Sequence, residues 1–162
     1  MIKITVKSDT KLWDDLKQRL QQDTSELQIG FFEESRYGPE NNNLQVALVA
    51  AWNELGHSGD VPPRPFMRVG LKGLLSSSLY TTKYKEAFIR TLIGKGNITS
   101  GYTAIQDSVV PDLKKIIDDW LEPPNSPSTI KRKDGRNDPL VDTGKMRDSV
   151  KAKISKTFKR KI

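Results

Sequence analysis

The chain has 162 residues, with 27 Lys and Arg against 20 Asp and Glu, and its formal charge is +7 at pH 7. This length suits one ordinary domain, and no stretch approaches the ~20 consecutive apolar residues of a membrane span, which excludes a membrane protein. The chain has no cysteine and one histidine, which excludes disulfide scaffolds, thiol nucleophiles, Cys/His zinc sites and Ser-His-Asp catalysis.

The positive charge is concentrated near the C-terminus. Residues 128–162 hold 12 Lys and Arg against 4 Asp and Glu, which leaves 15 against 16 for residues 1–127. Such a basic run can bind nucleic acid or another polyanion, because each neutralised phosphate releases counterions. It can equally be a solvated strand face or an arm that lies on an acidic neighbour. We divide the chain into an α+β core, 1–127, and a basic C-terminal part, 128–162, which belongs to the same domain or packs on a neighbour.

The N-terminal third alternates between strand and helix patterns. Residues 2–6 have the period-two pattern of a short strand, and they lack the apolar core of a signal peptide, so we expect the protein to stay in the cytoplasm after synthesis. Residues 10–20 predict an amphipathic helix, and residues 27–31 predict a second strand. Residues 33–43 contain Gly-Pro and three consecutive asparagines, and we interpret them as a long mobile loop.

The middle of the chain is mainly helical. Residues 44–55 predict a helix that ends at a glycine, and the prolines of residues 61–66 then impose a stiff, extended crossing. Residues 67–93 are apolar at helical intervals and form either two helices or one that starts late. Residues 99–121 predict a long helix with a kink at Pro111.

The C-terminal part begins with a polar loop over residues 128–139. Asp142 or Thr143 can then cap a single helical turn that carries Met146. Residues 150–154 alternate apolar residues with lysines and predict a last strand with one strongly basic face. Together these elements predict an α+β fold with a small antiparallel sheet packed against several helices, a long mobile loop and a basic C-terminal strand or arm.

Few residues could carry chemistry. His57 follows a helix end without a second histidine, and we interpret it as a surface turn residue. The acidic run Asp118–Glu122 is interpreted as a solvated face, because adjacent helical residues point in different directions. The tryptophans Trp13, Trp52 and Trp120 all have apolar neighbours at helical spacing and are expected in the core.

Four short motifs follow one another along the chain. They read A-x-x-N-E-L-G at 50–56, P-x-R-P-F-M-R at 62–68, S-P-x-T-I-x-x-K at 126–133 and P-L-V-D-T-G-x-M-R-x-S-V at 139–150. In this order they resemble the head-tail joining and tail-completion proteins of tailed bacteriophages, which are also described as virion morphogenesis or neck proteins. The resemblance covers residues 44–154, about two thirds of the chain.

The resemblance implies a small α+β protein that assembles into a ring between the head and the tail. A hexamer is favoured and a dodecamer is possible. The implied partners are further copies of the chain, the connector or head-closure proteins and the tail tube or sheath proteins, with DNA in the channel. The implied location is the virion neck, and neither catalysis nor a cofactor or metal is expected. The alternative is a small nucleic-acid-binding module that acts through the basic arm, whereas a hydrolase would need a pair of carboxylates that the sequence does not supply.

Two groups of residues are the candidate site. We expect the first group to contact sister copies or neighbours: the arginines would form bidentate pairs with carboxylates across subunits, or else surface ion pairs within the chain, and the lysines would face an acidic partner or DNA. The second group would form a structural turn that contacts no substrate. The first group is Arg64, Phe66, Arg68, Lys151, Lys153 and Lys156, and the second is Asp142, Thr143 and Gly144.

Overall fold

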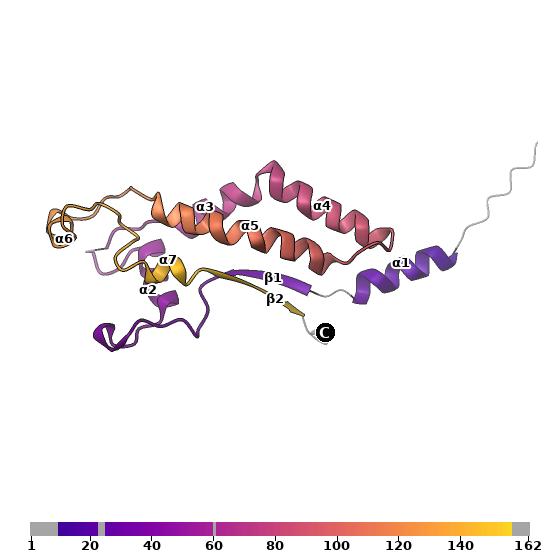
Figure 1. Ribbon diagram of the computed structural model, residues 1–162, viewed down its shortest axis with the longest axis horizontal. Helices are drawn as coiled ribbons and strands as arrows, with labels where there is room; N and C mark the ends of the chain where they lie inside the picture. Colours follow the sequence, from indigo (N-terminus) through magenta and orange to yellow (C-terminus); the bar gives the residue numbers. More distant parts are fainter. Residues whose placement is uncertain (1–9, 23–24, 60, 157–162) are drawn as a thin grey trace, which may run out of the picture.

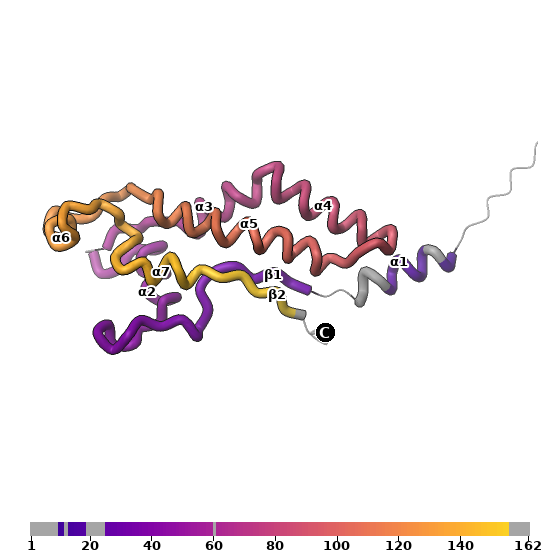
Figure 2. Tube along the Cα trace, in the orientation of Figure 1, coloured from indigo at the N-terminus to yellow at the C-terminus, as the bar shows by residue number. Residues whose placement is uncertain are grey.

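The computed structural model describes residues 10–22, 25–59 and 61–156 (Figures 1 and 2). The fold is α+β, with a small antiparallel sheet packed against several helices, which confirms the predicted class. The strands are β1 (Ser25–Gly30) and β2 (Lys151–Lys156). The helices are α1 (Thr10–Gln22), the 3-10 helix η1 (Pro39–Asn41), α2 (Val46–Leu55), α3 (Phe66–Leu75), α4 (Ser78–Leu92), α5 (Ile98–Asp118), α6 (Pro127–Arg132) and α7 (Lys145–Asp148).

Helix α5 is the central element of the fold. It packs against α3 and α4 on one side and against both strands on the other (Figure 1). Helix α1 extends beyond the end of the sheet and contacts α4 (Figure 1). Although α5 is 21 residues long, neither it nor any other described helix is apolar enough to cross a membrane.

The two strands pair antiparallel over their whole length, from Gly30 opposite Lys151 to Ser25 opposite Lys156. Because side chains alternate along a strand, one face of the sheet carries Leu27 and Ile29 toward the helices, while the lysines at 151 and 153 are exposed. The period-two patterns therefore predicted both strands and their inner faces. The strand predicted over residues 2–6 lies outside the described residues.

The main core joins segments that are far apart in the sequence. Residues 140–150 contribute to the same cluster as α2, α3 and α5, so a boundary at residue 127 does not separate two cores. A second cluster, of Tyr80, Ile105 and Val109, lies between α4, α5 and β1. The buried residues of the main core are Val46, Ala50, Phe66, Leu113, Ile117, Leu140, Met146 and Val150.

The helices decide between two alternatives at one place and differ from expectation at another. Residues 67–93 form two helices, α3 and α4, which are separated at Ser76 and Ser77. The segment predicted as a polar loop, 128–139, begins with the short helix α6. Its first turn is capped by Ser126, whose Oγ accepts a hydrogen bond from the Thr129 amide at 3.3 Å, and Pro127 occupies the first helical position.

The segment predicted as a mobile loop, 33–43, is folded on itself. The Tyr37 amide donates to the Leu44 carbonyl at 2.9 Å, and the Val46 amide donates to the Ser35 carbonyl at 3.0 Å. The 3-10 helix η1 forms the tip. Backbone hydrogen bonds therefore order this segment, although its side chains are polar.

One predicted core residue is exposed instead. Trp13 lies on the amphipathic helix α1, as expected, but 59% of its surface is accessible. The helical period identifies an apolar face correctly, but it cannot say whether the same chain covers that face. Trp52 and Trp120 are both half-buried, and the ring of Trp52 stacks on His57, which is an exposed turn residue as predicted.

Two glycines inside helices give a matched test of the packing between α4 and α5. A β-carbon on Gly101 would lie 2.2 Å from Cβ of Ala87, whereas one on Gly73 would meet nothing within 4 Å. We expect Gly101→Ala to lower the free energy of unfolding by about 1–3 kcal/mol through overpacking. We expect Gly73→Ala to raise it by about 0.5–1 kcal/mol through helix propensity. Urea unfolding measures both, and equal effects of the two substitutions would contradict this packing.

Candidate functional site

Arg64 is a buried brace between separate parts of the chain. Its side chain belongs to the crossing between α2 and α3, and only 5% of the residue is accessible. Nε donates to the Pro123 carbonyl at 2.9 Å, and a terminal nitrogen donates to the Pro124 carbonyl at 3.2 Å. The other terminal nitrogen donates to Oδ1 of Asn53 at 3.4 Å, and the Arg64 amide donates to the Asn53 carbonyl at 2.6 Å. Burial lowers the pKa of the guanidinium.

The expected intersubunit roles of Arg64 and Phe66 are therefore wrong. The donors of Arg64 are used within the chain, on carbonyls rather than on carboxylates. Phe66 has no accessible surface and lies in the main core, with its ring edge-on to Phe31 at 6.2 Å between centroids. The prolines of residues 61–66 suggested that this crossing is exposed. The segment that follows α5 covers it instead.

Arg68 stays at the surface, beside the start of α3. Its side chain is 69% accessible, and its Nε lies 3.8 Å from Oε1 of Glu54. The Glu54 carboxylate also accepts hydrogen bonds from the amides of Met67 and Arg68, at 2.9 and 3.2 Å. Glu54 thus satisfies two amide donors in the first turn of α3, where a negative charge is favourable. Glu54 belongs to the first motif, but no local sequence pattern predicts this role.

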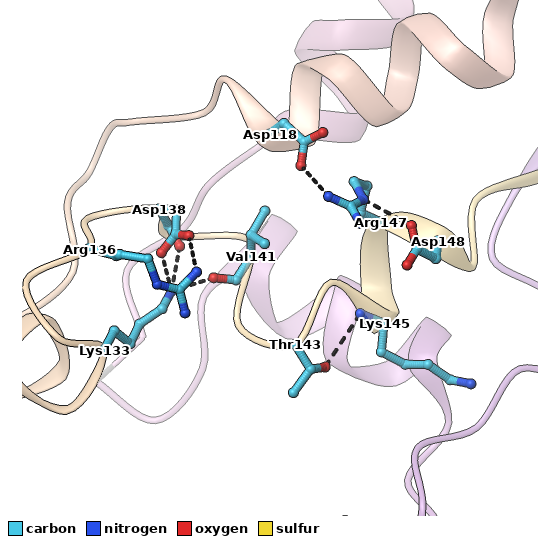
Figure 3. A network of polar contacts seen from close by, with 9 residues as sticks. All are labelled: Asp118, Lys133, Arg136, Asp138, Val141, Thr143, Lys145, Arg147 and Asp148. Carbon is cyan, nitrogen blue, oxygen red and sulfur yellow. Dashed lines mark hydrogen bonds and ion pairs between the residues drawn. The ribbon is translucent and has the colours of Figure 1, made fainter.

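The turn at 142–144 is structural, although the capping differs from the prediction. Gly144 itself is the cap residue of α7, with φ +79°, a left-handed conformation that glycine adopts most easily. The Thr143 hydroxyl accepts a long hydrogen bond, 3.4 Å, from the Lys145 amide (Figure 3). Asp142 is exposed and is not the cap residue. Met146 is buried and holds α7 against the core, as expected.

Asp142 and Thr143 also line a small cavity of about 210 Å³, opposite Tyr37 and Asn53. Burial, together with the nearby charge of Asp142, raises the pKa of the Tyr37 hydroxyl. The cavity therefore joins two motif segments to the 33–43 segment. Among the described residues, no group of three or more carboxylate or imidazole side chains is placed to hold a metal ion.

Lys133 is a buried cation that the sequence analysis missed. Its Nζ lies 2.5 Å from Oδ1 of Asp138, donates to the Asp138 carbonyl at 2.7 Å and also donates to the Val141 carbonyl (Figure 3). Arg136 pairs with the other Asp138 oxygen at 2.9 Å. Burial acts to raise the pKa of Asp138, but the bond from Lys133, a backbone hydrogen bond and the nearby cations lower it by more, so it lies below its ordinary value.

Arg147 links α7 to the C-terminal end of α5. It contacts Asp148 at 2.9 Å and Asp118 at 3.2 Å (Figure 3). Its bonds to both carboxylates raise the pKa of Arg147, and the bond from Arg147 lowers the pKa of Asp148. Asp118 is therefore part of an ion-pair network at the surface.

Two lysines of β2, Lys151 and Lys153, face solvent, as their spacing predicted. Lys151 is exposed, and Nζ of Lys153 lies 2.6 Å from Glu34 and 4.1 Å from the centroid of the Phe32 ring. The bond from Lys153 lowers the pKa of Glu34. The backbone of Lys156 pairs with Ser25, and its side chain lies outside the described residues. The candidate residues thus separate into a buried brace, a structural turn and a basic strand.

The two arginines of the second motif provide a matched stability test. We expect Arg64→Met to lower the free energy of unfolding by about 2–4 kcal/mol, because carbonyls of Pro123 and Pro124 lose their donors. We expect Arg68→Met, at an exposed position, to lower it by less than about 1 kcal/mol. Chemical unfolding of the isolated chain measures both values. Equal stability of the Arg64→Met variant and the parent would contradict the brace.

Asp138 gives a test that depends on pH. A carboxyl whose pKa is lower in the folded chain than in the unfolded one stabilises the fold above the unfolded value, about 3.9, and loses this effect as pH falls through its folded-state pKa. We expect Asp138→Asn to be less stable than the parent at neutral pH, and the difference to shrink in acid. Asp134→Asn, in an exposed turn, is the control. A difference that grew in acid would contradict the assignment.

Comparison with known proteins adds no relative on which a role could be based. The chain matches no protein-family model, no curated protein and no solved structure.

Proposed function

We propose that this protein is a structural component of a tailed-phage virion. It forms a ring in the neck, as a tail-completion component, and joins the head connector to the tail. Its partners are sister copies, most simply six, the adjoining connector or head-closure protein and a tail tube or sheath protein. It acts by contact and transforms no substrate.

The observation that carries this proposal is that the motif residues pack in the core of the fold. The first, second and fourth of the motifs that resemble neck proteins meet in one core. Arg64, which also donates to Asn53, holds the segment before the third motif through the carbonyls of Pro123 and Pro124. The motif residues buried in the main core are Ala50, Phe66, Leu140, Met146 and Val150. These motif residues stabilise the fold, and none of them forms an exposed reactive site. This use of the motifs supports a role in assembly.

The surface outside this core supports the same proposal. Several large apolar side chains are more than half exposed on α3, on α4 and just beyond their ends, and exposed apolar groups of this kind are typical of contact surfaces. Arg68 and Lys151 are exposed as well. The apolar residues are Val69, Leu75, Leu79, Ile89 and Ile93.

The charge distribution favours this role over a nucleic-acid-binding arm. Among the described residues, four C-terminal cations form ion pairs within the chain: Lys133, Arg136, Arg147 and Lys153. A cation that is already paired with a carboxylate contributes less to phosphate binding than a solvated one. The basic segment is therefore weaker as a polyanion site than its composition suggests.

Purified virions test the proposal. We expect mass spectrometry to find this chain in the particles, and imaging to place it at the head-tail junction with six-fold or twelve-fold symmetry. We expect particles made without it to be separate heads and tails. Absence of the chain from virions would contradict the proposal. Tight DNA binding by the isolated chain that weakens steeply between about 50 and 200 mM salt would favour the nucleic-acid-binding alternative.

A further inference from the structure

The outer edge of β2, on the side away from β1, is a template for another strand. β2 pairs with β1 over six residues, and the described residues form a sheet of only these two strands. A two-stranded sheet is marginal by itself, and an edge strand presents backbone donors and acceptors in a row. The figures show β2 on the side of the sheet away from α4 (Figure 1).

A groove of about 450 Å³ runs beside this edge. It lies between β2 and the flank of α5. Val110 and Ala152 are among its apolar lining residues, and charged residues that include Glu34 and Asp107 also line it. Pro111 lines it too and has no amide hydrogen, so the Asp107 carbonyl lacks its usual partner within the helix. The groove therefore offers apolar surface and backbone hydrogen-bonding groups together, which is what an added strand requires.

The chain contains a segment with the matching chemistry. Residues 2–6 read Ile-Lys-Ile-Thr-Val, with apolar residues at every second position, as in the two strands of the sheet. One side of such a strand would cover the apolar lining of the groove, and the other side would face solvent beside the β2 lysines. These residues precede the described part of the chain.

The position of α1 directs this segment to another copy. Three residues separate Val6 from Thr10, so Val6 lies within about 14 Å of the start of α1. Helix α1 has 13 residues, a length of about 20 Å, and its start is the end that lies away from the sheet (Figure 1). With α1 in this position, Val6 cannot fold back past the far end of α1, so residues 2–6 cannot pair along the length of β2 in their own chain.

The exposed face of α1 also supports a contact with another copy. Trp13 is 59% accessible, although it lies on a strongly amphipathic helix. An apolar ring that the described part of its own chain leaves largely uncovered is available for burial by another surface. An N-terminal arm of strand and helix that packs on a neighbouring copy would bury it.

We propose that residues 2–6 of one copy pair with the outer edge of β2 in a second copy. The shared sheet then has three strands from two chains. Each copy donates an arm and accepts another, a head-to-tail contact that closes into a ring when the rotation permits. The inference rests on the proposed function, because it names the contact by which copies of a neck protein would assemble.

Cross-linking tests this contact directly, since the chain has no cysteine of its own. Chains with Thr5→Cys are mixed, in separate experiments, with chains carrying Lys151→Cys, Lys153→Cys or Ser155→Cys, which sample the possible registers. We expect at least one mixture to form a covalent dimer under mild oxidation. The matched control is Lys85→Cys on the exposed face of α4, which should give only background.

Three results would overturn the inference. The first is a dimer yield no higher than that of the control in every mixture. The second is cross-linking within a single chain that carries both cysteines, without cross-linking in the mixtures, which would place the strand on its own sheet. The third is an undiminished yield when Ile4→Asp, a charge on the apolar side of the strand, is added to the Thr5→Cys chain.

The failure of this inference is distinguishable from the failure of the proposed function. Virions that contain the chain, together with mixtures that do not cross-link, would overturn the arm contact alone. Mixtures that cross-link, together with virions that lack the chain, would overturn the virion role alone.

Discussion

The structure depends on one buried guanidinium. The Arg64 side chain donates to the carbonyls of Pro123 and Pro124 and to the side chain of Asn53, and its backbone amide donates to the Asn53 carbonyl. Asn53 lies near the end of α2, and the two prolines lie in the segment that leaves α5. Without these bonds, two segments about 60 residues apart in the sequence would have no polar connection at this point. The brace fixes where the C-terminal part begins its return to the core. Everything that follows, including the path of β2 along α5, starts from that fixed position.

The return path explains why the C-terminal charges are arranged as they are. The chain leaves α5, forms α6 and must turn back before α7 can place Met146 in the core. The ion pair between Lys133 and Asp138 stabilises this turn of the chain, and the ion pair between Arg147 and Asp118 connects α7 to the end of α5 (Figure 3). These charges therefore serve the fold first, whereas Lys131, Arg132, Lys145 and Lys151 are exposed at the surface.

The sequence predicted the elements better than their environment. Hydrophobic period found α1, α2, α5 and both strands, because that period is set by local geometry. It failed at Trp13 and at Arg64 for the same physical reason: exposure depends on which distant segment covers a residue, and no local pattern contains that information. The short helix α6 was missed because its stabilisation comes from a serine cap and a proline rather than from an apolar stripe. The turn at Gly144 was predicted as structural, but the capping group was misassigned between neighbouring residues.

The shared core also has a consequence for the order of folding. Val46 and Phe66 are synthesised well before Leu140, Met146 and Val150, which belong to the surface that covers them. A nascent chain on the ribosome therefore keeps this apolar surface exposed until residue 150 has been synthesised. Native packing is completed only after the last strand has left the exit tunnel, so prematurely terminated products would lack a closed core and would be substrates for chaperones and proteases.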